Sequence, residues 1–169
     1  TNMAVHGFDG VHIRQVGKKN ELWLGESKIY SSGELGVKSL CTDVKTHFAE
    51  DYLRKEFMLI SRKIKLLDNI PEKAYWIDLM HKHTKLDEIF NSVVIPIICT
   101  YSSDTFKKHT DNTKEFFDEF ERECRSLQKK FYEQKIKTDL NVILMLFPIP
   151  DKDELLKILH QRLYHMQNV

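Results

Sequence analysis

The chain has 169 residues, which is enough to bury the core of one compact domain. It is 41% apolar and 30% charged with a formal net charge of +1, so its charge balance does not indicate a nucleic-acid, membrane or acidic partner. Three widely spaced cysteines argue against a disulfide framework or a zinc ribbon and fit a reducing cytoplasm. No apolar run approaches the roughly 20 residues that span a bilayer, so we expect no membrane partner.

The first predicted element is a β-hairpin. Residues 10–16 ("GVHIRQV") alternate apolar and polar side chains, residues 17–20 ("GKKN") supply turn chemistry, and residues 21–30 ("ELWLGESKIY") form the second strand. We expect one domain over residues 1–169. Because the chain opens at Thr1 rather than at a methionine, we interpret it as the C-terminal part of a longer protein.

One face of the second strand is unusual in carrying two charges. Side chains alternate with period two, so one face holds Leu22, Leu24, Glu26, Lys28 and Tyr30. Burying a charge is costly unless it has a partner, a metal or a function. Glu26 and Lys28 therefore need an explanation that the strand pattern does not provide.

Two helices are predicted after the hairpin, and a third is expected to begin near Pro71. The first covers about residues 34–50, and the second covers about residues 51–67. The apolar stripe of the first is Leu35, Leu40, Val44, Phe48 and Tyr52. The stripe of the second is Leu53, Phe57, Ile60, Ile64 and Leu67.

The remaining elements alternate between strand and helix. Residues 92–101 form a continuous apolar run typical of a strand covered on both faces, in which Pro96 suggests an edge position or a bulge. A long amphipathic helix over 111–137, a buried strand over 139–149 and a last helix over 151–166 follow. This order predicts an α/β fold with a central mixed sheet flanked by helices.

The charges on this strand face can be explained together with Asp9 in "GFDG". A hairpin could bring the carboxylates of Asp9 and Glu26 to one end of the sheet. With the backbone carbonyl of Ser27 they would form an oxygen-only site that suits Mg²⁺ or Mn²⁺. Lys28 could then position an attacking water or stabilise charge on a phosphate. The alternative is an ordinary salt bridge between Glu26 and Lys28 on an exposed sheet.

Other polar residues are weaker candidates. Lys38 and Lys45 of the first helix could contact a DNA backbone, although such lysines more often solvate a helix. His81 and His83 fall on a predicted helix, where residues i and i+2 do not share a face, so we do not expect them to bind metal together. The chain has no glycine-rich phosphate loop of the P-loop type.

The order of these motifs resembles the PD-(D/E)xK nuclease core. More narrowly, four segments of the chain resemble the HamA family, the nuclease subunit of the Hachiman anti-phage defence system. They are "GFDGVHI", "LWLGESKIY", "VVIPIICTYSSD" and "LFPIPDKDELLKILHQRL". The most recognisable of them is the "WLGE-x-K-x-Y" strand, which here runs from Trp23 to Tyr30.

The resemblance implies a metal-dependent DNA endonuclease in which Asp9 and Glu26 bind the metal and Lys28 is the catalytic lysine. It also implies a superfamily 2 helicase partner (HamB) that restrains the nuclease until infection or DNA damage. A glutamate on an upstream helix, used by many nucleases of this superfamily, has no counterpart ahead of Asp9 in this sequence. A non-catalytic docking subunit with the same fold, and an RNase, are the alternatives.

Overall fold

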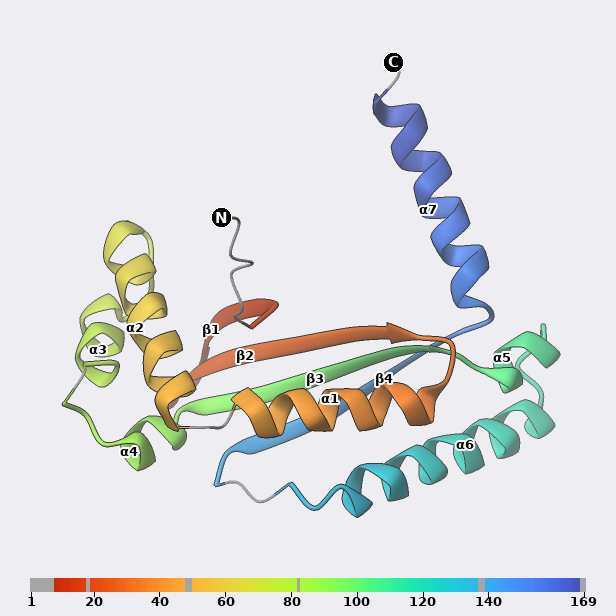
Figure 1. Ribbon diagram of the computed structural model, residues 1–169, viewed down its shortest axis with the longest axis horizontal. Helices are drawn as coiled ribbons and strands as arrows, with labels where there is room; N and C mark the ends of the chain where they lie inside the picture. Colours follow the sequence, from red (N-terminus) through yellow and green to blue (C-terminus); the bar gives the residue numbers. More distant parts are fainter. Residues whose placement is uncertain (1–7, 18, 48–49, 82, 137–138, 168–169) are drawn as a thin grey trace. The chain divides into compact units, whose positions relative to one another are not determined.

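A computed structural model of the chain describes residues 8–17, 19–47, 50–81, 83–136 and 139–167. The helices and strands alternate much as predicted, with two short additional helices, α4 and α5 (Figure 1). In chain order they are β1 (Gly10–Val16), β2 (Lys19–Tyr30), α1 (Gly33–His47), α2 (Glu50–Leu66), α3 (Lys73–Leu79), α4 (Leu86–Phe90), β3 (Val93–Ser102), α5 (Asp104–Lys108), α6 (Lys114–Glu133), β4 (Asn141–Ile149) and α7 (Lys152–Gln167).

The four strands form one mixed sheet in the order β1-β2-β3-β4, which confirms the predicted α/β class. The expected edge position of Pro96 is wrong, because β3 lies between β2 and β4. Pro96 is tolerated inside the sheet beside a glycine. A Cβ atom added to Gly25 would lie 3.7 Å from the Pro96 ring, at ordinary van der Waals distance.

The predicted hairpin is confirmed, with β1 antiparallel to β2. The pairing runs from Val16 opposite Lys19 at the turn to Gly10 opposite Gly25 at the far end. Gly17 follows β1 with φ of 62°, the left-handed backbone that glycine adopts without steric cost and that hairpin turns require. This register decides which residues of the two strands lie opposite one another.

The helix α1 buries a different stripe from the predicted one. Leu35 is 59% exposed, whereas the buried positions follow the helical repeat from the first residue of the helix. These positions are Gly33, Gly36, Val37, Leu40, Cys41 and Val44. Phe48, also predicted for this stripe, lies outside the described residues. In α2 the predicted stripe is confirmed except for Leu67, which lies beyond the helix and is exposed.

Residue contacts divide the chain into two compact units, each assembled from three separate segments. Unit 1 comprises Thr1–Glu26, Thr42–Ile97 and Ile136–Ile143. Unit 2 comprises Ser27–Cys41, Ile98–Lys135 and Leu144–Val169. Each unit is described by itself below.

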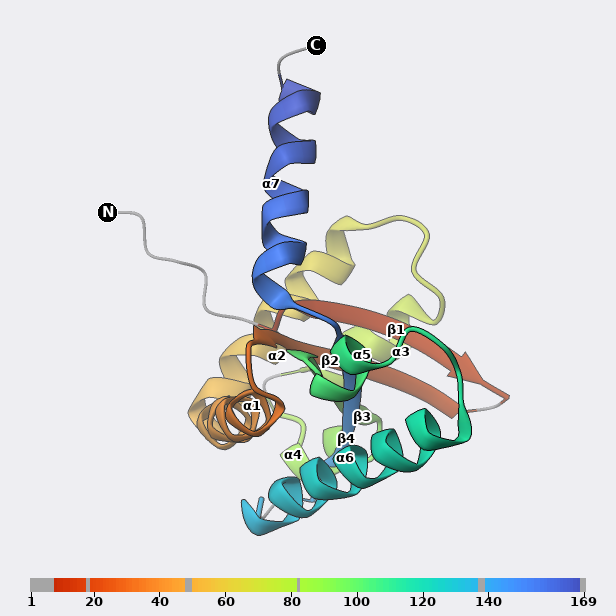
Figure 2. The ribbon, with the colours of Figure 1, turned by 90° about the vertical axis from the view of Figure 1, so that its right-hand side faces the viewer.

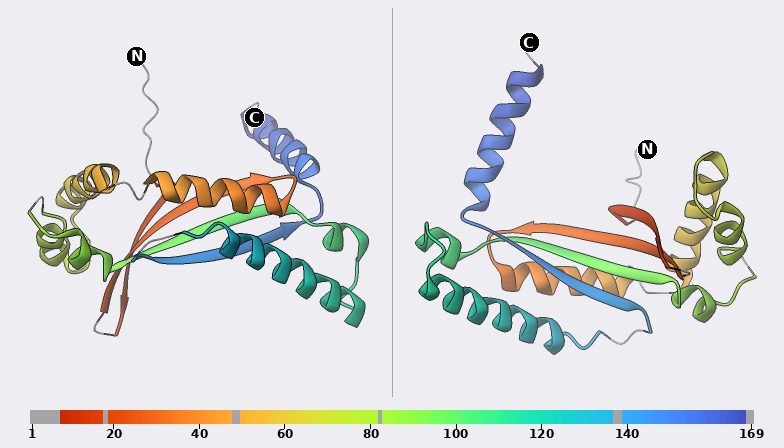
Figure 3. Two further views of the ribbon diagram at one scale, coloured as in Figure 1. Left: turned by 60° about the horizontal axis from the view of Figure 1, so that its bottom comes forward. Right: turned by 180° about the vertical axis from the view of Figure 1, so that it is seen from behind.

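Unit 1 has its core where α2 and α3 pack together and where the first residues of β2 and β3 pair (Figure 3). The backbone N–H of Leu22 donates to the Ser92 carbonyl at 2.7 Å, and the Ser92 hydroxyl lies 3.0 Å from the hydroxyl of Tyr75. Apolar side chains from these elements, among them Leu22, Phe57 and Trp76, are fully or almost fully buried. Their burial supplies most of the free energy that holds the unit together.

Unit 2 is organised around the packing of α5 on α6 (Figure 2). Phe106 meets Phe116 and Phe120 edge to face, with ring centroids 5.2 Å apart in both cases. The Thr113 hydroxyl caps α6 by accepting the Phe116 N–H at 3.2 Å. Along the apolar side of α6, Phe116 and Leu127 are buried, while Phe120, Cys124 and Phe131 are partly exposed.

The last two elements differ from the predictions in their burial. Strand β4 is half-buried through most of its length rather than fully buried, because it is the edge strand of the sheet. Asp151 caps α7 by accepting the N–H groups of Glu154 and Asp153, and these bonds hold the pKa of its carboxyl below the usual value. The helix itself buries no residue. Of the helices in the described part of the chain, none has both the length and the apolar character to cross a membrane.

Candidate active site

The two carboxylates predicted to bind metal are related by the hairpin register. Asp9 is exposed and lies directly before β1, whose first residue Gly10 pairs with Gly25. The observed pairing ends at Gly10, and Asp9 lies in a bend just before it, so Asp9 would lie opposite Glu26 only if the register continued by one more residue. Residues opposite each other in such a pair extend their side chains from the same face, with Cβ atoms about 4.5–5.5 Å apart.

Glu26 is a buried acidic residue, as the strand pattern predicted. It is only 3% exposed and continues the buried face of β2 after Leu22 and Leu24. Its Oε1 atom lies 2.8 Å from the Nδ1 atom of His47, the last residue of α1. The two atoms are close enough for an ion pair when the imidazole is protonated, but they are not aligned as a hydrogen bond. A charged or polar partner from a helix therefore offsets part of the cost of burying this carboxylate.

Aromatic rings hold His47 in place. Tyr52 of α2 stacks on the imidazole with ring centroids 4.6 Å apart and planes 6° from parallel. Phe8 meets the same imidazole edge-on at 5.6 Å. Burial raises the pKa of Tyr52, and the negative charges of Glu56 and Glu26 raise it further. The imidazole thus lies between two rings and a carboxylate that come from three parts of unit 1.

The sequence patterns did not predict that His47 and its aromatic neighbours lie beside Glu26. Twenty residues separate His47 from Glu26 in the sequence, and no periodicity relates the two positions. The one available signal was the position of His47 at the end of a helix, where a cation is favoured by the helix dipole. That signal does not distinguish a surface residue from one that contacts a buried glutamate.

The other predicted site residues lie on β2 and α1. Lys28 follows Glu26 by two residues on the same strand and is half-buried, while Ser27 between them is exposed. Lys38 and Lys45 are both exposed on α1. They are seven residues apart, so they lie on the same side of that helix.

His81 and His83 differ from their predicted setting. The helix α3 ends at Leu79, so both histidines follow it in the chain, and their ring centroids approach to 5.3 Å. The prediction that helix geometry separates them is therefore wrong. Within the described ranges, no group of three or more His, Cys, Asp or Glu side chains could hold a metal ion, so the pair forms no such group.

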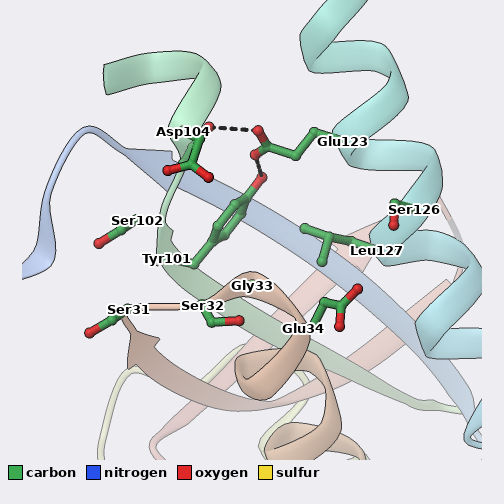
Figure 4. A pocket seen from close by; sticks show the side chains of 11 residues that line it. Ser31, Ser32, Gly33, Glu34, Tyr101, Ser102, Asp104, Glu123, Ser126 and Leu127 are labelled. Carbon is green, nitrogen blue, oxygen red and sulfur yellow. Dashed lines mark hydrogen bonds between the residues drawn. The ribbon is translucent and has the colours of Figure 1, made fainter. Parts of the chain in front are cut away.

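Unit 2 contains a polar cavity of about 320 Å³ that sequence analysis also missed (Figure 4). Glu123 lines it, and its carboxylate accepts hydrogen bonds from the hydroxyls of Tyr101 at 2.6 Å, Ser103 at 2.9 Å and Thr105 at 2.7 Å. Burial and the bond to Glu123 raise the pKa of Tyr101 far above its usual value. The cavity wall includes the first turn of α1 at Gly33 and Glu34.

The Glu123 cluster joins three elements of unit 2 rather than forming a reactive site. The hydroxyls come from the end of β3, the residue after it and α5, and the acceptor comes from α6. Each hydroxyl donates its only proton to the carboxylate, so none is poised as a nucleophile beside a base. We therefore interpret the cluster as a structural clamp.

The fold and the buried glutamate of the hairpin are compatible with one class of protein. A mixed sheet flanked by helices, with a buried glutamate on a strand of the sheet, is consistent with a nuclease-like core. The chain belongs to the HamA family, whose family model matches residues 1–163. Membership of this family, the Hachiman defence subunit family, indicates a protein of anti-phage defence. No curated protein and no solved structure matches the chain.

Proposed function

We propose that this HamA protein is a metal-dependent endonuclease that hydrolyses DNA phosphodiesters. The observation that supports the proposal is the burial of Glu26 one residue beyond the last hairpin pair, Gly10–Gly25, which Asp9 directly precedes in the chain. Burying Glu26 is costly, the contact with His47 offsets part of that cost, and a cation shared with Asp9 would offset more of it. Family membership in anti-phage defence agrees with an enzyme that destroys nucleic acid.

The donor set fits Mg²⁺ or Mn²⁺. Both ions prefer oxygen ligands, and Asp9, Glu26 and the Ser27 carbonyl are oxygen donors. Mg²⁺ commonly uses one or two carboxylates and completes its shell with water and substrate phosphate. A site with two carboxylates is therefore sufficient, and the exposed position of Asp9 leaves the pair accessible to substrate. When bound, the cation would lower the pKa of a water molecule and polarise the phosphate.

The chain's own groups have distinct roles in this proposal. Asp9 and Glu26 hold the cation, and Glu26 is fixed by its burial in β2. Lys28 presents an ammonium group with three N–H donors on the strand face that carries Glu26. There it holds the attacking water or the scissile phosphate and stabilises the negative charge that develops in the transition state.

DNA affinity and regulation require further groups. Lys38 and Lys45 on one side of α1 are proposed to contact phosphates of the DNA backbone. The net charge of +1 gives the chain little general affinity for DNA. We therefore propose that a superfamily 2 helicase subunit (HamB-like) delivers the substrate and restrains cleavage until infection. The free thiols of all three cysteines suit a cytoplasmic protein.

Plasmid cleavage with Mn²⁺ tests the proposal. Glu26→Gln and Lys28→Met keep the size of each side chain but remove its charge, and we expect each to lower the cleavage rate on the order of 10²–10⁴-fold. Glu21→Gln is the matched control, because Glu21 lies on the same strand but contacts Trp23 and Lys19 instead. Full cleavage and full phage protection by both charge-neutral variants would refute the catalytic assignment and favour a docking subunit.

A matched RNA substrate in the same assay separates DNase from RNase activity. Cleavage of DNA with intact RNA of the same sequence is the expected result. Preferential cleavage of RNA would assign the enzyme to the alternative class while leaving the roles of Asp9, Glu26 and Lys28 in place.

A further inference from the structure

We propose that His47 is the positioning residue for Glu26, and that the Tyr52 ring is part of the same device. This inference rests on the proposed function, because it assigns to His47 the task of orienting a carboxylate that binds Mg²⁺ or Mn²⁺. His47 itself is not proposed as a ligand of the cation or as a group that contacts substrate. It acts through Glu26.

The contact is specific to one atom of each group. The Nδ1 atom of His47 approaches Oε1 of Glu26 to 2.8 Å, with the two side chains only 17% and 4% exposed. An imidazole with a proton on Nδ1 presents an N–H toward this oxygen, and a small rotation would align it as a hydrogen bond. Each carboxylate has two oxygens with several lone pairs, so holding Oε1 is compatible with cation binding by the same group.

The imidazole is itself held by its neighbours. Tyr52 stacks almost parallel to the ring at 4.6 Å, and Phe8 closes from the edge at 5.6 Å. These contacts restrict rotation of the His47 ring about its side-chain bonds, so the direction of the Nδ1 contact is also restricted. Tyr52 of α2 and Phe8 from the segment before β1 therefore hold the His47 ring, and His47 alone contacts the Glu26 oxygen.

A role in packing alone would not require this chemistry. The helix dipole favours a cation at the end of α1, but exposed cations satisfy that preference equally well. A packing role would be met by any aromatic residue between Tyr52 and Phe8. Only a residue with a donor at the Nδ1 position can fix the carboxylate, and groups that orient a metal-binding carboxylate commonly change metal affinity when they are removed.

Substitutions that separate the ring from its donor test the inference. His47→Phe keeps the aromatic ring and removes Nδ1, whereas His47→Asn removes the ring and keeps an amide N–H donor close to the Nδ1 position. Titration of the full chain with Mn²⁺, followed by calorimetry without DNA, measures cation affinity directly. The Mn²⁺ concentration for half-maximal plasmid cleavage provides the second readout.

We expect His47→Phe to weaken Mn²⁺ binding roughly 10–100-fold and to raise the Mn²⁺ requirement for cleavage by the same factor. Cleavage at saturating Mn²⁺ should be largely retained, since the ligands themselves are present. His47→Asn should bind Mn²⁺ within about threefold of the unaltered chain. Equal Mn²⁺ affinity in the unaltered chain and His47→Phe, or an equal loss in both His47 variants, would overturn the inference.

Tyr52→Leu keeps the test decisive if His47→Phe does not fold. It leaves His47 and Glu26 in place but removes the stacked ring, and we expect about a threefold or larger loss of Mn²⁺ affinity. Unchanged Mn²⁺ affinity in that variant would count against a role of the Tyr52 ring in holding His47. The control is Glu26→Gln, in which loss of Mn²⁺ binding supports the metal site itself. If Glu26→Gln binds Mn²⁺ normally, the proposed function fails; if only the His47 and Tyr52 variants bind normally, the inference alone fails.

Discussion

Replacing Glu123 with alanine removes the acceptor shared by three buried hydroxyl groups of unit 2. Tyr101, Ser103 and Thr105 are 2%, 2% and 6% exposed, and each donates to this one carboxylate. A buried polar group left without a partner costs about 1–3 kcal/mol. The cavity beside the cluster admits water that can replace some of the lost bonds. We therefore expect a loss of about 3 kcal/mol rather than the full sum.

Urea unfolding followed by circular dichroism measures this loss. For a chain of this length, about 3 kcal/mol corresponds to a fall in melting temperature of roughly 6–12 °C. Glu123→Gln retains one carbonyl acceptor and should cost about 1 kcal/mol. Glu121→Ala is the matched control, since Glu121 lies two residues away on α6 and pairs on the surface with Arg125. Such exposed pairs contribute about 0.2–1 kcal/mol.

A comparison of the two alanine variants can refute the structural role of the Glu123 cluster. If Glu123→Ala and Glu121→Ala unfold within about 0.5 kcal/mol of one another, the hydroxyl cluster is not a structural clamp. The buried hydroxyls would then have to find other acceptors at little cost.

Three further predictions concern close packing and pH. Gly36→Ala should lower the free energy of unfolding by about 1–3 kcal/mol, because the added Cβ would lie 2.5 Å from the Cys99 sulfur. Adding Cys99→Ala to the same chain should recover part of this loss. A Gly36→Ala chain more stable than the unaltered one would contradict this. Because the pKa of Tyr101 is raised in the fold, the contribution of Tyr101 to the free energy of unfolding is fully present below pH 10 and is lost as pH rises above it. Thermal melts at alkaline pH should show a smaller loss of stability in Tyr101→Phe than in the unaltered chain. Hydrogen bonding, chiefly from Lys108, holds the pKa of Glu119 at about 2, so the stabilising contribution of Glu119 is present above pH 4.5 and is lost as pH falls toward 2. Thermal melts of Glu119→Gln should therefore depend less on pH in this acid range. An unchanged acid dependence would argue against the Lys108–Glu119 pair.

Elements with a clear period in their side chains were predictable from the sequence. The alternation in β1 and β2 and the apolar run of β3 fixed their positions to within a few residues. The α1 stripe was misplaced because two of its buried positions are glycines. A Cβ on Gly33 would lie 2.9 Å from Leu127 and Tyr101, so the helix makes its close contacts through backbone that a hydrophobicity pattern does not register.

The candidate site was predictable in part for a similar reason. Glu26 drew attention as a charge on a strand face, and its burial to 3% exposure is the physical fact behind that signal. The contact with His47 and the carboxylate clamp at Glu123 depend on tertiary structure, since each joins residues about twenty positions apart. Neither a motif nor a period relates such residues before the chain folds.

The boundaries between unit 1 and unit 2 have a practical consequence for dissecting the protein. Four of them fall inside secondary structure, between Glu26 and Ser27 in β2, within α1 after Cys41, and within β3 and β4. Cutting the chain at any of these points severs a ladder of backbone hydrogen bonds rather than a linker. Neither unit can therefore be expressed as a contiguous fragment, and limited proteolysis should yield intact chain or small peptides rather than a stable half.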